Sequence, residues 1–226
     1  MKAVAVILAT GDGSRVGCPE ANLEYEKGRS FLRWLSSTFQ KAGCSPLGVI
    51  RTGAEDVKER HPDAWLVEGP ANDGIKTGIR AALEEGAEMV VIHSVEKPAI
   101  RTSTIDKLIK SMDGTEGVVP DFEGAPGTPV VLSRSAAERV LGMEGVTSTL
   151  ALVQKLDLRR VATRDPGVLV AIDSPESYER LLGSKPHPAP VPKKRGKKTD
   201  ETGSSAGEDV GSGAAMNASP GGLGEG

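Results

Sequence analysis

The sequence predicts an α/β fold in which a mostly parallel sheet is covered by helices on both faces. Three observations carry this prediction. Short apolar runs alternate with helix-like segments from residue 3 to residue 182, which is typical of parallel strands joined by crossover helices. A glycine-rich loop directly follows the first apolar run, and the composition changes near residue 184. The folded part is therefore predicted to be a single domain, residues 1–183, of ordinary size for this class.

The composition of residues 184–226 differs from that of the preceding chain. Hydrophobic residues nearly disappear there, and a proline-rich stretch is followed by the basic run Lys193 to Lys198 and a Gly/Ser-rich end. Such a segment buries too little apolar surface to offset its ordering entropy, so we expect a disordered tail. The basic run is compatible with RNA, a membrane surface or an acidic partner, but a solvated linker is the preferred interpretation.

Charge and cysteine content limit the class of protein. The formal net charge of −3 over 226 residues does not indicate a nucleic-acid-binding protein. No apolar stretch approaches the roughly 20 residues that span a membrane, and no N-terminal signal is visible, so we expect a cytoplasmic protein. The two cysteines, Cys18 and Cys44, have neither a disulfide framework nor metal-ligand spacing, which fits a reducing compartment.

The first apolar run, residues 3–8, leads into the stretch LATGDGSRVG at residues 8–17. Its glycines permit positive φ and remove Cβ atoms that would separate a ligand from the backbone, so consecutive N–H groups can converge on an anion. Arg15 adds a guanidinium that can pair with phosphate oxygens. The stretch is neither a Walker A loop nor the dinucleotide fingerprint. A polyphosphate cradle and a plain strand-to-helix turn are both compatible with these residues.

The following segments continue the alternation of strands and helices. Ser30 can cap a helix with an apolar face, and Gly43 ends it. Later runs predict strands at 47–50, 65–67 and 88–93 and helices at 54–60, 75–85 and from Ser103 onward. The runs near 118–119 and 129–132 flank a Gly/Pro loop, as in a hairpin or an extension of the sheet. Helices at 136–141 and 148–156 and a strand at 168–172 follow, and Ser174-Pro175-Glu176 begins a last helix.

The glycine loop resembles the signature Leu-Ala-Ala-Gly-x-Gly-x-Arg-Met-Gly that opens nucleotidyltransferases of the MobA-like type, including the molybdopterin guanylyl- and cytidylyltransferases. Thr10 takes the place of the second alanine, and Val16 that of the methionine. The resemblance implies a Rossmann-like nucleotidyltransferase domain. It assigns nucleotide binding to these loop residues: Leu8, Ala9, Gly11, Gly13, Ser14, Arg15 and Gly17.

A second segment with possible nucleotide contacts precedes the helix at 75–85. A helix N-terminus after a glycine-bearing loop is a natural anion site. Residues 77–83, TGIRAAL, resemble the family's Ser-Ser-Val-Arg-x-Gly-Leu, whose helix lies against the nucleotide. We therefore expect Asn72 and Thr77 to contact the nucleotide. Gly78 has a second interpretation, in which a small residue lets the helix pack closely on the sheet.

The strand at 88–93 ends in Ser94-Val95-Glu96-Lys97-Pro98, where the family carries Val-Asp-x-Pro with a magnesium-binding aspartate. Mg²⁺ takes one or two carboxylates plus substrate phosphates, so the resemblance implies Glu96 as a metal ligand. Lys97 beside it either reduces the need for a cation or pairs with a surface acid. His93 is interpreted as a strand-end residue and not as a base.

Two further motifs complete the resemblance. The turn Gly127-Thr128-Pro129 resembles the family's Gly-His-Pro, a part associated with the acceptor substrate, with Thr128 in the histidine position. Residues 171–178, AIDSPESY, resemble Asp-Ile-Asp-Thr-Pro-Glu-Asp-Tyr, with Ala171 in place of the first aspartate. Asp173 is then a second candidate metal ligand, although helix capping explains it equally well.

The resemblance implies transfer of a nucleoside monophosphate from CTP or GTP to a phosphorylated acceptor, a molybdopterin-type cofactor in the first instance, with release of pyrophosphate. Mg²⁺ is the implied cofactor, and Arg15 and Glu96 are the implied catalytic residues. Glu20, however, falls where the family has a lysine that attracts the triphosphate, and Lys27 is the nearest cation. Two alternatives therefore stay open: a catalytically impaired nucleotide-binding or regulatory pseudoenzyme, and a sugar-phosphate nucleotidyltransferase, which usually has a longer chain.

Overall fold

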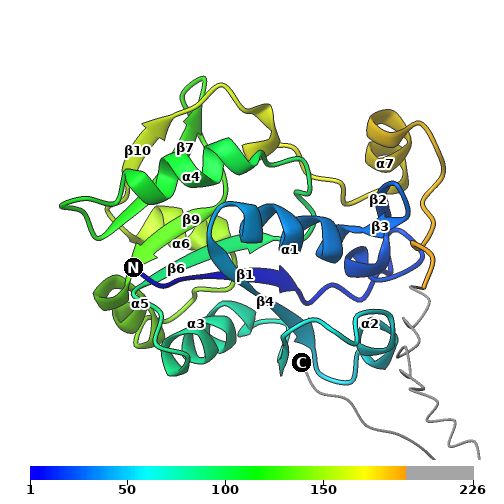
Figure 1. Ribbon diagram of the computed structural model, residues 1–226, viewed down its shortest axis with the longest axis horizontal. Coiled ribbons are helices and arrows are strands. Elements are labelled where there is room, and N and C mark those ends of the chain that lie inside the picture. The colour runs from blue at the N-terminus through cyan, green and yellow to red at the C-terminus, as the bar shows by residue number, and fades with distance from the viewer. Residues whose placement is uncertain (192–226) are drawn as a thin grey trace, which may run out of the picture. The chain divides into compact units, whose positions relative to one another are not determined.

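The computed structural model describes residues 1–191, and its centre is an eight-stranded sheet in the order β10-β7-β9-β6-β1-β4-β5, with β8 paired to β7 (Figure 1). The basic run Lys193 to Lys198 lies outside the described residues. The strands of this sheet are β1 (Ala3–Ala9), β4 (Cys44–Arg51), β5 (Leu66–Gly69), β6 (Met89–Ser94), β7 (Gly117–Phe122), β8 (Ala125–Pro126), β9 (Val130–Ser133) and β10 (Arg159–Ala162). A separate pair is formed by β2 (Glu24–Glu26) and β3 (Arg29–Ser30).

The sheet is mostly parallel, as predicted. β1 lies between β4 and β6 and runs parallel to both, with Ile7 opposite Gly48 on one side and His93 on the other. β9 is antiparallel to β6 and to β7, so β7 again runs in the direction of β6. The carboxyl ends of β1, β6 and β7 therefore lie at one edge, which is where ligands bind in open α/β sheets.

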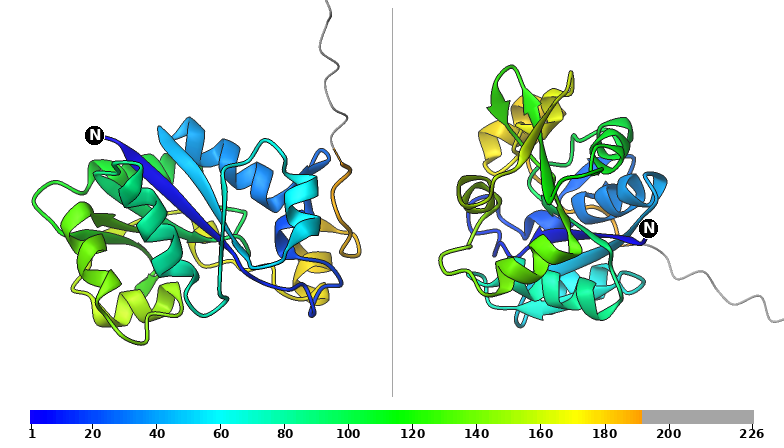
Figure 2. Two further views of the ribbon diagram at one scale, coloured as in Figure 1. Left: turned by 90° about the horizontal axis from the view of Figure 1, so that it is seen from below. Right: turned by 90° about the vertical axis from the view of Figure 1, so that its left-hand side faces the viewer.

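Helices cover both faces, which confirms the predicted layers (Figures 1 and 2). Alternate residues of β1 point to opposite faces, so that Ala5 and Ile7 belong to one apolar core and Val4 and Val6 to the other. The first core packs under α1 (Phe31–Lys41) and α4 (Thr102–Lys110), and the second under α3 (Gly74–Glu84), α5 (Arg134–Leu141) and α6 (Thr149–Lys155). The remaining helical segments are α2 (Glu55–Arg60), α7 (Pro175–Leu182) and the 3-10 turns η1 (Glu20–Asn22) and η2 (Pro166–Val168).

The predicted capping residues begin their helices. The Ser30 hydroxyl accepts a hydrogen bond from the Arg33 amide at 3.3 Å and starts α1. At α7, the Ser174 hydroxyl accepts from the Ser177 amide at 3.2 Å, and the Ser177 hydroxyl accepts from the Ser174 amide at 3.0 Å. This reciprocal pair fixes the segment that carries Asp173. No helix of the described chain is long and apolar enough to cross a membrane.

The predicted strand at 168–172 is wrong. Val168 lies in η2, and Ile172 lies in an irregular segment after it. Both side chains are buried, so their packing in the core explains the apolar pattern without a strand. The strand in this part of the chain is β10, which the sequence analysis did not predict. β10 is the outermost strand of the sheet and is largely exposed, so its sequence, RRVA, lacks the apolar signal of an inner strand.

The ordered chain also continues beyond the predicted boundary at residue 183. The amide of Glu24 donates to the carbonyl of His187 at 3.0 Å, and the amide of Ala189 donates to the carbonyl of Asn22 at 2.8 Å. Residues 184–191 therefore run along η1 and β2, and the prediction of disorder from residue 184 starts too early. Backbone pairing, which composition does not reveal, holds this polar segment.

Candidate nucleotide and metal site

The glycine loop lies where it was predicted, at the carboxyl end of the central strand β1. Gly13 and Gly17 have positive φ, at 72° and 87°, and the Gly13 carbonyl accepts the amides of Val16 and Gly17 at 3.1 and 2.8 Å. A Cβ atom at Gly13 would overlap the backbone of Cys18. These two glycines are thus required by the shape of the loop itself.

Part of the loop backbone remains available to a ligand. The Ser14 amide is occupied, because it donates to the Asp12 carboxylate at 2.9 Å and so lowers the pKa of that carboxyl. The amides of Gly11, Asp12, Gly13 and Arg15, by contrast, have no acceptor among residues 1–191. Three consecutive free amides form the kind of concave donor group that binds anions. The Ser14 amide is therefore not free for the predicted contact, which stays a prediction for the side chain alone.

Leu8 and Ala9 hold the loop to the next strand. The Leu8 carbonyl accepts the Val95 amide at 2.9 Å, and Ala9 is buried in the core. This bond ties the start of the glycine loop to the segment that carries Glu96. The two residues therefore position the candidate site, and their side chains lie in or against the apolar core.

Glu20 is buried directly beneath the glycine loop. Its side chain is 3% exposed, and a Cβ atom at Gly11 would overlap the Glu20 carboxylate. Gly11 thus makes room for an acid at the position where the resemblance leads one to expect a lysine. The carboxylate adds a negative charge close to the free amides of the loop, which opposes the binding of a polyphosphate.

Arg15 joins the two carboxylates that were predicted as metal ligands. Its Nη2 atom lies 2.9 Å from Glu96 Oε1, and its Nη1 atom lies 3.3 Å from Asp173 Oδ2. The amide of Ile172 donates to the Glu96 carbonyl at 2.7 Å and holds the closing segment against the end of β6. Residues from three distant parts of the chain are therefore brought together, as the sequence predicted.

The charges around Arg15 are predominantly negative. Burial raises the pKa of the Glu96 carboxyl, and the charges of Glu20 and Asp173 raise it further, whereas Arg15 opposes them. The guanidinium thus pairs with two carboxylates and a third lies near Glu96, so that even with Lys97 the carboxylates outnumber the cations, an arrangement that attracts a further cation. The described residues contain no group of three or more His, Cys, Asp or Glu side chains arranged to hold a metal. Glu96 and Asp173 are hard oxygen donors that suit Mg²⁺ when substrate phosphates complete its shell.

The segment before α3 lies next to the glycine loop, but Thr77 does not point to it. A Cβ atom at Gly74 would be 3.0 Å from Cγ2 of Thr10, so the first turn of α3 touches the loop. The Thr77 side chain instead packs on Gly69 of β5. Gly78 packs on Val6, where any Cβ atom would overlap, which supports its close-packing interpretation. Asn72, which is exposed in the loop before α3, keeps its predicted role as a candidate contact.

The predicted acceptor turn contains an unsatisfied hydroxyl. The Thr128 side chain is 3% exposed, and its Oγ1 atom has no hydrogen-bond partner within the described chain. The Thr128 amide donates to the Val168 carbonyl at 3.0 Å, and the ammonium of Lys97 reaches the same oxygen at 3.4 Å. Burial lowers the pKa of Lys97. Lys97 is thus a partly buried cation next to Glu96, a placement that the sequence left open.

His93 is a strand-end structural residue, as interpreted from the sequence. It is fully buried on β6, and its Nε2 atom lies 2.9 Å from the Lys97 carbonyl. Burial lowers its pKa to about 4, so the ring is neutral at pH 7 and donates from Nε2. His93 therefore holds the segment that presents Glu96 and Lys97.

Comparison with known proteins identifies a family and a shared fold. A family model described as the MobA-like NTP transferase domain matches residues 5–175. A probable molybdenum cofactor guanylyltransferase of Mycobacterium ulcerans is 26% identical over 75% of this chain and 88% of its own length. A bifunctional enzyme IspD/IspF of Ruegeria sp. (strain TM1040) is 28% identical over 53% of this chain. The chain spans only 33% of that relative and 41% of another IspD/IspF enzyme.

The fold is shared with solved structures of low sequence identity. Rv0371c of Mycobacterium tuberculosis superimposes with a TM-score of 0.70 at 21% identity, covering 81% of this chain and 98% of that one. The same protein in complex with manganese gives a TM-score of 0.68. The match of the family model over most of the domain shows that the chain belongs to the family of MobA-like NTP transferase domains.

Proposed function

We propose that the protein transfers a nucleoside monophosphate from GTP or CTP to a phosphorylated acceptor and releases pyrophosphate. The observation that carries this proposal is the Arg15 guanidinium bridging Glu96 and Asp173 beside a loop with free amides. A cation and two carboxylates at the carboxyl edge of the sheet can neutralise phosphate oxygens and hold a divalent cation. Family membership supports the general reaction class.

The nucleotide side is formed by the glycine loop. The free amides of Gly11, Asp12 and Gly13 would donate to the triphosphate, and Arg15 would leave the carboxylates to pair with phosphate oxygens. Its side chain is 57% exposed, so this rotation needs no repacking of the core. The exchange places the positive charge of Arg15 on the leaving pyrophosphate.

Departure of Arg15 frees Glu96 and Asp173 for a divalent cation. Their four oxygens are a suitable donor set for Mg²⁺, and the crystallisation of Rv0371c with manganese supports a metal in a protein of this fold. When bound, the cation would supply positive charge that neutralises phosphate oxygens during the transfer. In this proposal Glu96 and Asp173 hold the cation and thereby orient the nucleotide.

The acceptor side would lie between Glu96 and the turn at Thr128. The buried Thr128 hydroxyl lacks a partner in the described chain, and the Lys97 ammonium has only a backbone carbonyl at 3.4 Å. The Lys97 ammonium can orient an anionic acceptor, whereas the Thr128 hydroxyl is buried. An acceptor phosphate oxygen then attacks the α-phosphorus, the bond to the bridging oxygen breaks, and pyrophosphate takes the electron pair. The names of the mycobacterial relatives support a molybdopterin-type acceptor.

A second candidate function is nucleotide binding without transfer. The specific observation in its favour is Glu20, which places a buried carboxylate beneath Gly11 where the family pattern has a lysine. In this case the protein would sense or carry a nucleotide through the fold it shares with the enzymes.

The experiment that separates the two functions measures pyrophosphate release and nucleotide binding in parallel. Each of the four NTPs is supplied with and without Mg²⁺ and with molybdopterin as acceptor. We expect Mg²⁺-dependent pyrophosphate release with GTP or CTP only when the acceptor is present. Tight NTP binding without release under every condition would support the binding protein, and absence of binding would contradict both functions.

A further inference from the structure

A hollow of about 570 Å³ lies between the first turns of α4 and the end of β10. Its lining contains three cationic residues, Arg101, Lys107 and Arg164, together with three hydroxyl residues and one carboxylate, Asp165. None of these residues belongs to the cluster around Arg15. The hollow is therefore a second polar site with its own charge.

The single carboxylate of this hollow is committed to the fold. Asp165 is 3% exposed, and its Oδ2 atom accepts the Arg101 amide at 2.9 Å and the Thr104 hydroxyl at 2.7 Å. Its Oδ1 atom accepts the Gly167 amide at 3.0 Å. Both oxygens thus fasten η2 to the start of α4. The Asp165 carboxylate is not free to form close hydrogen bonds with the cationic side chains around it.

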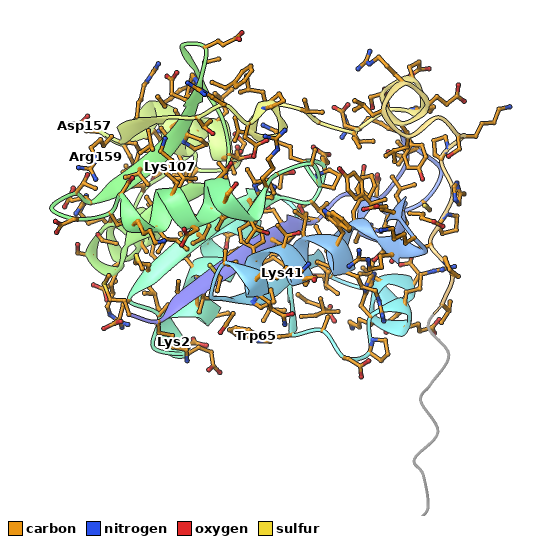
Figure 3. All side chains as sticks on the ribbon, turned by 45° about the horizontal axis from the view of Figure 1, so that its top comes forward. Lys2, Lys41, Trp65, Lys107, Asp157 and Arg159 are labelled. Atoms are coloured by element: carbon orange, nitrogen blue, oxygen red, sulfur yellow. The ribbon has the colours of Figure 1, made fainter. Side chains whose placement is uncertain are left out.

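The cations, in contrast, have no carboxylate of the described chain within hydrogen-bond distance. Arg101 Nε stays 3.8 Å from Asp165 Oδ1, and the Lys107 ammonium donates to the Ala162 carbonyl at 2.6 Å. Arg164 has no acceptor or carboxylate partner among residues 1–191. Two positive charges are therefore left uncompensated in the hollow. Figure 3 shows both Asp157 and Arg159 at the same end of the molecule as Lys107, so their opposite formal charges offset each other there.

Another hollow in the molecule has a different character. It measures about 420 Å³ and is lined by residues of α1 and of the segment before β5. Its arginines already have partners, since Arg33 donates to the Arg60 carbonyl at 3.1 Å and Arg29 lies 4.5 Å above the ring of Trp34. Asp63 adds a negative charge to its wall. The excess of unused positive charge is thus a property of the hollow at α4.

We propose that the hollow at α4 is an anion site that binds the phosphate group of a small molecule. Two uncompensated charges match a phosphate dianion, and guanidinium and ammonium groups with neighbouring hydroxyls are its usual ligands. No aromatic side chain lines the hollow, so it lacks the stacking platforms on which single-stranded nucleic acids bind. The proposal does not depend on nucleotidyl transfer, because the site shares no residue with the glycine loop.

The test uses inorganic pyrophosphate as the probe and calorimetry as the readout. The full-length Arg15→Met protein removes the arginine of the glycine loop, and the substitutions at Lys107 and Arg164 then show how much of the remaining binding belongs to the hollow. We expect this protein to bind pyrophosphate with one site. Combining Lys107→Ala with Arg164→Ala should weaken that site about tenfold or more, since two charge-assisted contacts are lost. Arg180→Ala, which removes an exposed arginine of α7, should change the affinity less than about twofold.

Several results would overturn the proposal. Absence of pyrophosphate binding to the Arg15→Met protein would do so, as would equal affinities for the double variant and Arg180→Ala. A mixed-sequence single-stranded RNA that binds more tightly than pyrophosphate, and depends on Lys107 and Arg164, would assign the hollow to nucleic acid instead. Lys107→Arg should retain binding, which separates loss of charge from misfolding. Failure of nucleotidyl transfer would appear separately, as absence of NTP turnover by the unaltered protein.

Discussion

Two clusters at the carboxyl edge of the sheet have opposite charge patterns. Around the glycine loop, Arg15 pairs with the carboxylates of Glu96 and Asp173. Glu20 adds a third carboxylate near Glu96, and Lys97 is the second cation. At the start of α4, one carboxylate, Asp165, lies among three cations. In each cluster a residue of the minority charge, Arg15 or Asp165, bridges elements that are distant in the sequence.

The difference indicates how each cluster can bind an anion. The cluster at α4 has more cations than carboxylates, so we expect it to bind a phosphate without an accompanying metal cation. The cluster at the glycine loop is too negative to do so, and a polyphosphate would require a metal cation to accompany it. We therefore propose that this protein has a metal-dependent anion site at the glycine loop and a metal-independent one at α4.

The largest effect that we predict concerns His93, which lies between the two clusters. Burial dominates and brings its pKa to about 4; the hydrogen bond to the Lys97 carbonyl opposes this, the Lys97 charge lowers the pKa further and Asp165 raises it. Because the unfolded histidine takes up a proton below about pH 6.5 and the folded one does not until about pH 4, stability must fall as the pH drops through this range. We expect His93 to account for about 2 kcal/mol of the loss between pH 7 and pH 5.

Urea unfolding of the unaltered protein and of His93→Gln at pH 7 and pH 5 measures this contribution. The glutamine amide can still donate to the Lys97 carbonyl, so the variant should lose less stability on acidification. Identical losses for the two proteins would show that His93 does not titrate in this way. His61, which burial also brings to a pKa of about 4, should give a similar contribution of its own.

The next effect probes the contact between Gly11 and Glu20. Gly11→Ala should destabilise the protein by about 1–2 kcal/mol, because the new methyl group overlaps the buried Glu20 carboxylate. In a Glu20→Ala background the same substitution should cost less than about 0.5 kcal/mol. Gly13→Ala is the matched control, since it overlaps backbone and requires positive φ, so Glu20→Ala should not rescue it. Additive free energies of unfolding for Gly11→Ala and Glu20→Ala would contradict the contact.

The smallest effect concerns the charge of Glu20 alone. Glu20→Gln keeps the size of the side chain but removes a negative charge beneath the free amides of the loop. We expect the affinity for GTP or CTP to rise about three- to tenfold, with a steeper gain at low salt. Glu144→Gln removes an exposed charge outside the cluster and should leave the affinity unchanged. A fall in affinity with Glu20→Gln would mean that the acid supports nucleotide binding.

Much of the fold could be predicted from sequence because the inner elements carry strong signals. The buried strands β1 and β6 are continuous apolar runs, and Ser30 and Ser174 mark helix starts by capping. The exposed edge strand β10 has no such signal. Residues 184–191 were missed for a related reason, because the backbone bonds that hold them leave no trace in the composition.

The candidate site likewise has residues that the sequence could locate and contacts that it could not. Motif order along the chain located Arg15, Glu96 and Asp173, which the fold then brings together. The ion pairs between them, the burial of Glu20 under Gly11 and the commitment of Thr77 to β5 depend on side-chain packing between segments. Lys107 and Arg164 belong to no motif, so only the structure reveals the hollow that they line.

The most direct test of the metal-dependent site is the effect of Mg²⁺ on nucleotide affinity. Calorimetric titration with GTP and CTP is performed with and without Mg²⁺ on the unaltered protein, on Glu96→Gln and on Asp173→Asn. We predict that Mg²⁺ increases the affinity of the unaltered protein about tenfold or more and has little effect on either variant. Equal affinities with and without Mg²⁺, or an undiminished Mg²⁺ effect in both variants, would contradict the assignment of Glu96 and Asp173.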